Sequence, residues 1–262
     1  MGVALVNLIW RRMAVNPAAL HWAWDTLKPA YTAGLIPAAA WSLRHSIALP
    51  AIAPFRSTDM AKLGLAEPTV SVIDAVLRTY ERGNAQNLVA LCALRRRLDA
   101  DWSSRMRATM ASAPVPADVA AEAADRVTEQ LPPLPAMNAL PETVQKTINS
   151  IAQTWVPVVQ RGMIPSVFRH LGHWPALLTA FNERLQSSGE AGLARIPDLA
   201  ERAIEQAAAH AAKLNLGADA ALRLDADVRA WTLQQIALFV DAMIGPGVVI
   251  VPALRQSLPR SD

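Results

Sequence analysis

Apolar residues recur at helical spacing along most of the chain. Leu20, Ala23, Trp24 and Leu27 follow an i, i+3, i+4, i+7 pattern, and a similar stripe runs through residues 70–77. No run of alternating apolar and polar residues is bounded by hairpin turns. We therefore predict an all-α fold, with helices over residues 3–15, from Pro17, over 38–49, from Glu67, and over 88–98. The pair Gly83-Asn84 is predicted to break the helix that begins at Glu67, with Asn84 able to cap the next one.

The chain contains an internal duplication. Residues 8–20 overlay residues 166–178 at an offset of 158, which pairs Trp10 with Phe168 and Pro17 with Pro175. Further along, residues 92–98 match residues 252–258 at an offset of 160, so two residues are inserted between these segments, near position 187. We predict two homologous helical repeats that form a pseudo-dimer around a central pocket, with Leu94 equivalent to Leu254.

Prolines mark the boundary between the two repeats. Six of them lie in residues 113–141, and they flank one polar, alanine-rich helix over residues 118–130. This composition is typical of a linker. The predicted organisation is a first helical repeat over residues 1–112, a proline-rich linker over 113–141, and a second repeat over 142–262.

Composition narrows the class of protein. The 262 residues carry a net charge of +3 and are 52% hydrophobic, and no basic stripe is interleaved with aromatic residues, so we expect no nucleic-acid partner. The most apolar segment, residues 236–254, is interrupted by Asp241 and by the break Gly245-Pro246-Gly247. It therefore predicts core helices rather than a membrane span. The single cysteine, Cys92, lies in an apolar run and fits a reducing, cytoplasmic compartment.

Few side chains have the spacing of known catalytic or ligand-binding motifs. His170 and His173 are three positions apart with no suitably spaced third ligand, so we predict no metal site. No phosphate-binding loop or dinucleotide fingerprint occurs, and no cofactor is expected.

Four polar residues are candidates for chemistry, each with an alternative structural role. Asn84 and Asn87 lie where two predicted helices meet, and an amide there can orient a carboxylate or a water, or cap a helix. Ser166 precedes a helix and can cap it or donate to an anion. Asp241 lies in an apolar stretch, where it is either a buried acid of raised pKa or a residue that faces solvent or an arginine.

The motifs together resemble the group I 2-haloacid dehalogenase family. They are residues 6–14 with Pro17, then Tyr80 with Gly83-Asn84, then residues 165–168 with residues 173–175. The resemblance covers nearly the whole chain and implies an all-helical pseudo-dimer. It also implies that a water, activated by an aspartate, displaces halide from a small 2-halo carboxylic acid without a covalent enzyme ester.

The resemblance also assigns positions to roles. It places the substrate asparagine at Asn84, the serine beside the catalytic acid at Ser166, and the catalytic aspartate itself at Val167. Pocket positions that are aromatic in the family fall on other residue types at Leu5, Leu8 and Asn87, and a family tyrosine falls near Phe239. The chain therefore keeps the amide and the hydroxyl but has an aliphatic residue in the place of the acid.

Three functions follow as alternatives. The protein is a dehalogenase-type hydrolase, which could use a different base such as Asp241. Alternatively, it is a non-catalytic relative that binds a small carboxylate or an apolar ligand, or it is a helical protein that only binds a partner. A small-molecule carboxylate is the expected ligand, no membrane partner is expected, and the sequence leaves the oligomeric state open.

Overall fold

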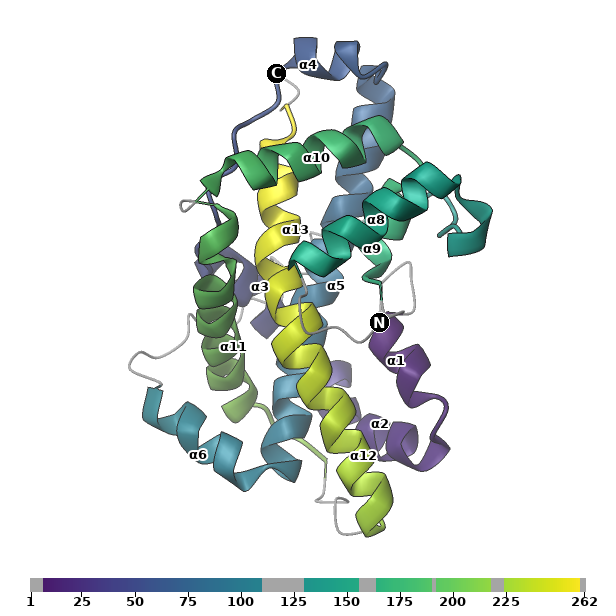
Figure 1. Cartoon of the computed structure of the whole chain (residues 1–262). Helices are drawn as coiled ribbons and strands as arrows, with labels where there is room; N and C mark the ends of the chain where they lie inside the picture. The colour runs from purple at the N-terminus through teal and green to yellow at the C-terminus, as the bar shows by residue number, and fades with distance from the viewer. Residues whose placement is uncertain (1–6, 110–129, 156–163, 190–191, 218–223, 260–262) are drawn as a thin grey trace.

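The computed structural model describes residues 7–109, 130–155, 164–189, 192–217 and 224–259, and these residues contain helices and no strands (Figure 1). The all-α prediction is confirmed for this part of the chain. The α-helices are α1 (Leu8–Met13), α2 (Pro17–Thr32), α3 (Leu35–Ser46), α4 (Ser57–Lys62), α5 (Glu67–Leu98), α6 (Ala100–Thr109), α8 (Glu142–Trp155), α9 (Ser166–Leu171), α10 (Pro175–Ser187), α11 (Ile196–Ala212), α12 (Ala226–Leu238) and α13 (Gly245–Ser257). Two short 3-10 turns, η1 (Met137–Ala139) and η3 (Leu193–Arg195), and a π-helix, η5 (Phe239–Ile244), complete the list.

Local signals explain where several helices begin. Pro17 and Pro175 occupy the first turns of α2 and α10, as predicted, because a proline there lacks only an N–H that would have no helical partner. The Asn16 side chain caps α2 by accepting a hydrogen bond from the Ala19 N–H. Asp225 caps α12 in the same way through the Val228 N–H, at 2.8 Å.

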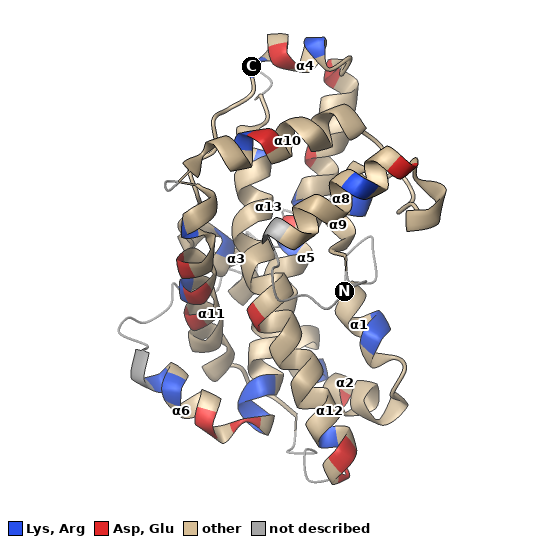
Figure 2. Ribbon diagram, in the orientation of Figure 1, with Lys and Arg blue, Asp and Glu red and all other residues tan. Residues whose placement is uncertain are grey.

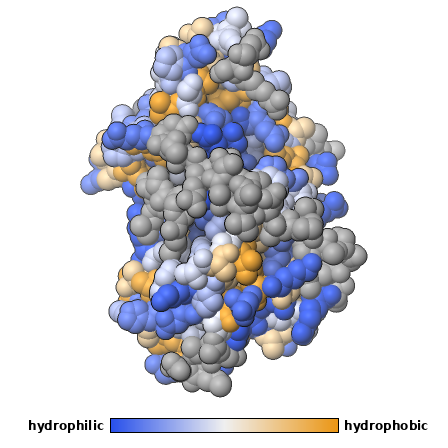
Figure 3. Space-filling view, turned by 180° about the vertical axis from the view of Figure 1, so that it is seen from behind, coloured by the Kyte–Doolittle hydropathy of each residue, from blue (hydrophilic) through white to orange (hydrophobic). Residues whose placement is uncertain are grey.

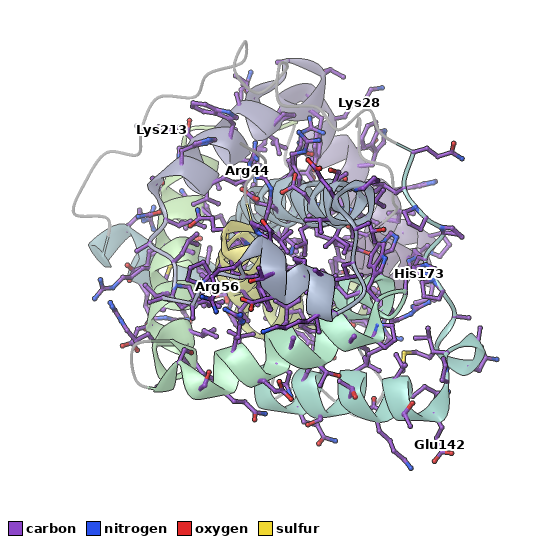
Figure 4. The ribbon with its side chains drawn as sticks, turned by 90° about the horizontal axis from the view of Figure 1, so that it is seen from above. Lys28, Arg44, Arg56, Glu142, His173 and Lys213 are labelled. Atoms are coloured by element: carbon purple, nitrogen blue, oxygen red, sulfur yellow. The ribbon has the colours of Figure 1, made fainter. Side chains whose placement is uncertain are left out.

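Helices α5 and α13 form the centre of the molecule. They pack against each other, and α3 and α11 pack against α5 (Figure 1). Residues 88–94 of α5 are all fully buried, as expected of a helix that is apolar on every side. Seen from above, the other helices surround this pair, and the labelled side chains of Glu142 and Lys213 lie at the rim (Figure 4).

Charged side chains lie mainly on the outer helices. Acidic and basic residues mark α4, α8, α10 and α11, whereas most of α13 carries neither (Figure 2). On the opposite face, the described residues are mostly hydrophilic, with separate, smaller hydrophobic patches between them (Figure 3). Among the described residues, the large hydrophobic side chains that are exposed are those of Val15, Trp24 and Val72, which lie at separate positions along the sequence. Isolated apolar side chains of this kind are normal on a protein surface.

The predicted helix break at Gly83-Asn84 is wrong. Helix α5 runs without interruption through both residues, so Asn84 is a mid-helix residue and caps nothing. The glycine serves packing instead, because a Cβ at position 83 would lie 3.3 Å from Nδ2 of Asn7. Gly83 thus lets the side chain of Asn7 lie directly against the helix backbone.

The predicted break at residues 245–247 is also wrong. Helices α12 and α13 are joined through the π-helix η5, and the Gly245 N–H bonds back to the Val240 carbonyl. The resulting helix, Ala226–Ser257, is long and apolar enough to cross a membrane by length and composition. However, 72% of its apolar window is buried inside the protein, as in the core helix of a soluble protein.

Helix starts recur along the chain. Helices α9 and α10 begin 158 positions after α1 and α2, while α11 begins 161 positions after α3 and α12 begins 159 after α5. The predicted linker helix over residues 118–130 lies outside the described residues except for its last residue, and so does the boundary at residue 113. Helix α8 begins at Glu142.

Candidate functional site

A cavity of about 60 Å³ lies where α1, α5, α9, η5 and α13 meet. Its volume suits a small molecule of a few heavy atoms. Its walls are mostly apolar, its polar groups are amides and hydroxyls, and none of the lining residues is acidic. The lining residues are Asn7, Leu8, Ile9, Tyr80, Asn84, Asn87, Pro165, Ser166, Val167, Phe168, Phe239, Met243, Ile244, Pro246, Gly247, Ile250 and Val251.

Most residues singled out from the sequence meet in this cavity. Six of them line it, although they come from segments more than 230 positions apart: Leu8, Asn84, Asn87, Ser166, Val167 and Phe239. Leu5 lies outside the described residues. Asp241 does not line the cavity.

Asp241 requires a correction. The side chain was expected to be either a buried acid or a residue facing solvent or an arginine, and the second alternative holds. It is 53% exposed, and its Oδ1 accepts a hydrogen bond from Nη1 of Arg95 at 2.7 Å. Its neighbours in η5, Phe239, Val240 and Met243, are buried, so Asp241 occupies the outer side of the π-helix. This position argues against a role as the base in the cavity.

Asn84 lies against helix α13. Its side chain is half-buried, and its Nδ2 is 3.0 Å from the point where a Cβ on Gly247 would lie. A glycine at position 247 is therefore what allows the amide to reach the wall formed by α13. Asn84 thus lines the cavity where helix α13 forms its wall.

Asn87 lies one turn after Asn84 on the same face of α5. Its Oδ1 accepts a hydrogen bond of 2.8 Å from Nε1 of Trp10, which is a donor only, so the orientation of the amide is fixed. Its Nδ2 is buried and has no hydrogen-bond partner among the described residues. The cavity wall therefore contains one amide N–H₂ group without a partner.

Two arginines, each the fourth residue of its helix, lie on α1 and α9. Nη2 of Arg11 donates to Oγ of Ser166 at 3.3 Å, which links an exposed cation to a lining residue of the cavity. Arg169 lies near enough that the positive charge of Arg11 adds to burial in lowering the pKa of Arg169. Two guanidinium groups therefore lie near Ser166 and Tyr80, which line the cavity.

Comparison with known proteins places the chain in a family. A model of the halocarboxylic acid dehydrogenase DehI family matches residues 4–143, just over half of the chain. The chain belongs to this family. No curated protein matches the DehI-family chain.

Solved structures of similar fold are D-2-haloacid dehalogenases. A mutant in complex with D-2-CPA is 19% identical, with a TM-score of 0.68. A second mutant structure is 20% identical, and a complex with L-LA is 21% identical; both have a TM-score of 0.65. Each comparison covers 98% of this chain and 87% of the other. At this level of identity, the likeness shows a shared fold.

In this DehI-family protein, Tyr80 of the cavity wall contacts His170 behind it, a pair that sequence reasoning missed. The Tyr80 hydroxyl lies 3.3 Å from Nδ1 of His170, and the two rings meet edge to face. His170 is fully buried, and its Nε2 lies 2.8 Å from the Pro132 carbonyl. Burial raises the pKa of Tyr80 and lowers the pKa of His170, which favours the neutral form of both.

A signal for this pair existed in the sequence. His170 follows Val167 by one helical turn, and Tyr80 precedes Asn84 by one turn. From the sequence, His170 was considered only as a metal ligand. Within the described residues, no three histidine, cysteine or acidic side chains come together at metal-binding distance.

Proposed function

We propose that the cavity binds a small 2-halo carboxylic acid and that the protein is a 2-haloacid dehalogenase-like hydrolase in which Val167 occupies the place of the catalytic aspartate. Family membership supports the dehalogenase-like activity. The observation that carries the proposal is the meeting of Asn84, Ser166 and Val167 in one cavity. These are the positions at which the family resemblance places the substrate amide, the neighbouring serine and the acid.

The polar groups of the cavity favour an anionic ligand. Asn84, Asn87 and Ser166 all carry donors, and the Asn87 amide already has its oxygen engaged, so it offers only N–H groups. The Arg11 guanidinium next to Ser166 adds a positive charge. With no acidic side chain among the lining residues, a carboxylate meets no repulsion there.

The valine at position 167 lowers the expected rate of halide release. A hydrolytic displacement needs a group that takes a proton as the water attacks, and an aliphatic side chain provides none. Losing a general base typically costs about 10²–10⁴-fold in rate. The amides can still orient water and stabilise charge. We therefore expect binding of 2-halo acids with slow halide release.

We also propose that the two halves are repeats that form a pseudo-dimer, with the cavity in the seam. The recurring helix starts support this arrangement. The cavity walls also come in pairs of elements: α1 is matched by α9, and α5 is matched by the η5–α13 segment. Superposition of the halves, with Pro17 over Pro175 and Leu94 over Leu254, tests it. The lone buried Cys92 remains in keeping with a cytoplasmic protein.

The second candidate is a non-catalytic protein that binds a small carboxylate or an apolar ligand in the same cavity. The aliphatic Leu8 and Val167 among the lining residues favour this function, because they add apolar contacts and no proton acceptor. It predicts binding without any halide release.

Two measurements test the proposal. The first is the melting temperature with and without each enantiomer of 2-chloropropionate, because a ligand that binds the folded state raises it. The second is halide release over long incubations. Asn84→Ala should reduce the melting shift, whereas Asn182→Ala on α10, away from the cavity, should leave it unchanged. Absence of any shift with both enantiomers would refute the proposal, and a shift without halide release would favour the non-catalytic alternative.

A further inference from the structure

We propose that Tyr80 and His170 form a proton relay that serves the cavity in place of the aspartate replaced by Val167. This inference rests on the proposed function, since it requires a water and a 2-halo acid in the cavity. Tyr80 is the catalytic residue because it lines the cavity. His170 acts through Tyr80 and is the positioning residue and final proton acceptor.

The geometry brings the relay to the position of the missing acid. His170 lies three positions after Val167 in α9, on the same side of the helix. Tyr80 reaches it from α5, with 3.3 Å between the hydroxyl and Nδ1. Both rings are buried, with Tyr80 5% exposed and His170 fully enclosed, so bulk water does not compete for this hydrogen bond.

The hydrogen bond to Pro132 fixes the tautomer of His170. A carbonyl oxygen only accepts, so the ring nitrogen that faces it, Nε2, carries the proton. In the neutral imidazole, Nδ1 then has a free lone pair, and the Tyr80 hydroxyl donates to it. The phenol oxygen keeps its own lone pairs for a donor in the cavity, such as a water molecule.

The groups around the pair keep the imidazole neutral before reaction. The His173 ring, in the turn that follows α9, lies beside the His170 ring, and Arg169 and Arg11 lie near Tyr80. Burial is the largest cause of the lowered pKa of His170; the hydrogen bond to Pro132 opposes it, and the neighbouring His173 adds to the lowering. The ring is therefore available as a proton acceptor at neutral pH, although it is a weaker base than a solvated histidine.

The chemical step balances without any co-reactant. The water oxygen forms a bond to C2 of the 2-halo acid, while the bond from C2 to the halogen breaks and the halide leaves with the electron pair. A water proton moves to the Tyr80 oxygen as the Tyr80 proton moves to Nδ1 of His170. The products are a 2-hydroxy acid, halide and an imidazolium, which returns its proton to solvent by the reverse path.

A purely structural role for His170 is the competing explanation. Its bond to Pro132 is one of three to neighbouring carbonyls, since His173, just after α9, contacts Pro133 and Arg169 contacts Pro135. His170→Gln separates the two roles, because the glutamine amide can still donate to Pro132 but cannot take up a proton. His173→Gln is the matched control, since it alters the neighbouring bond of the same kind at an exposed residue outside the cavity.

The experiment measures halide release from both 2-chloropropionate enantiomers by wild type, Tyr80→Phe, His170→Gln, the double variant and His173→Gln. We expect kcat to fall about 10²-fold in each relay variant, with KM little changed. The double variant should lose no more than either single one, as residues that act as a unit do. His173→Gln should match wild type.

Each contrary result has a distinct meaning. Halide release that survives His170→Gln within twofold overturns the relay and leaves the proposed function standing. A ligand-induced melting shift with no wild-type halide release also overturns the relay, and the cavity is then a binding site only. No shift and no release overturn both. Should the variants not fold, imidazole ¹⁵N spectra of the wild type decide, since a proton on Nδ1 of His170 is incompatible with the relay.

Discussion

Trp10 on α1 holds the Asn87 amide on α5 in a single orientation, through a hydrogen bond of 2.8 Å from Nε1 to Oδ1. The two residues are 77 positions apart, and the resemblance places an aromatic pocket residue at position 87. In this protein, an oriented amide therefore stands in the wall of the cavity, and its Nδ2 has no partner among the described residues. The contribution of the Asn87 side chain to stability therefore depends on its hydrogen bond with Trp10.

Trp10→Phe should destabilise the protein more than Asn87→Leu does. The first variant leaves a buried amide with no described partner, at a cost of about 1–3 kcal/mol. The second removes the unpaired N–H₂ group together with the bond and leaves a half-buried indole that water can reach, so it should cost about 1 kcal/mol or less. Urea unfolding of both variants measures the difference. Equal losses of stability in the two variants would mean that Trp10 does not hold the Asn87 amide in one orientation.

Val167→Asp should raise halide release and lower stability at neutral pH. The residue lines the cavity and is 4% exposed, so its carboxylate replaces the missing base but loses hydration, at a cost of about 2–4 kcal/mol. Burial would raise the folded-state pKa of this carboxyl above its unfolded value. The pH-dependent part of this loss should therefore grow as pH rises above about 4 and be absent below it.

Val167→Asn is the control for this variant, because it has nearly the same shape and cannot take up a proton. It should show neither the gain in halide release nor the pH-dependent loss of stability. A gain in halide release shared by both variants would show that polarity, and not proton transfer, limits the reaction.

Asp241→Asn should leave halide release and ligand-induced melting shifts unchanged. The carboxylate lies on the outer side of η5, is 53% exposed, and pairs with Arg95 rather than with anything in the cavity. An exposed ion pair contributes about 0.2–1 kcal/mol, and this contribution should shrink in high salt. If halide release were abolished, the base would have to be assigned to Asp241 after all.

Stability should fall as the solution is acidified from pH 7 to pH 5. Burial, helped by the charge of Lys213, lowers the pKa of His210 to about 4, and the pKa of His170 is also lowered. A histidine with a depressed folded-state pKa takes up its proton more readily in the unfolded chain. Its contribution is thus intact above the unfolded pKa of about 6.5 and is lost as pH falls below that value.

Urea unfolding at several pH values, with His210→Gln for comparison, measures this effect. Between neutral pH and pH 4, the free energy of unfolding of the wild type should fall by on the order of 2 kcal/mol more than that of His210→Gln. A slope identical to that of the wild type would show that His210 is hydrated in the folded protein.

The helical content and the starts of α2 and α10 could be predicted because they depend on local signals, an apolar period and a proline in the first turn. The two predicted helix breaks, at residues 83–84 and 245–247, were wrong because tertiary contacts decide whether the helix continues there. Gly83 looks like a helix breaker in isolation, yet its place in α5 depends on the approach of Asn7 from another segment. No periodicity within α5 contains that information.

The candidate site could be predicted only through motifs. Asn84, Ser166 and Val167 came from alignment with a family, and the structure places them together in one cavity. For Asp241 the sequence left two alternatives open, and only the structure decides between them, because the residue lies on the outer side of the π-helix and pairs with Arg95. The contact between Tyr80 and His170 spans 90 positions, so the sequence shows that each lies one helical turn from a motif residue but not that the two side chains meet.

The contacts from Arg169, His170 and His173 to Pro135, Pro132 and Pro133 hold the proline-rich connection ahead of α8 through its carbonyl oxygens. Any residue can present a carbonyl, so this connection tolerates changes of side chain far better than changes of length. Removing or adding one residue there would shift the carbonyls relative to α9, the helix that also carries Ser166 and Val167. Insertions in this connection, remote in sequence from the cavity, should therefore alter the cavity more than substitutions do.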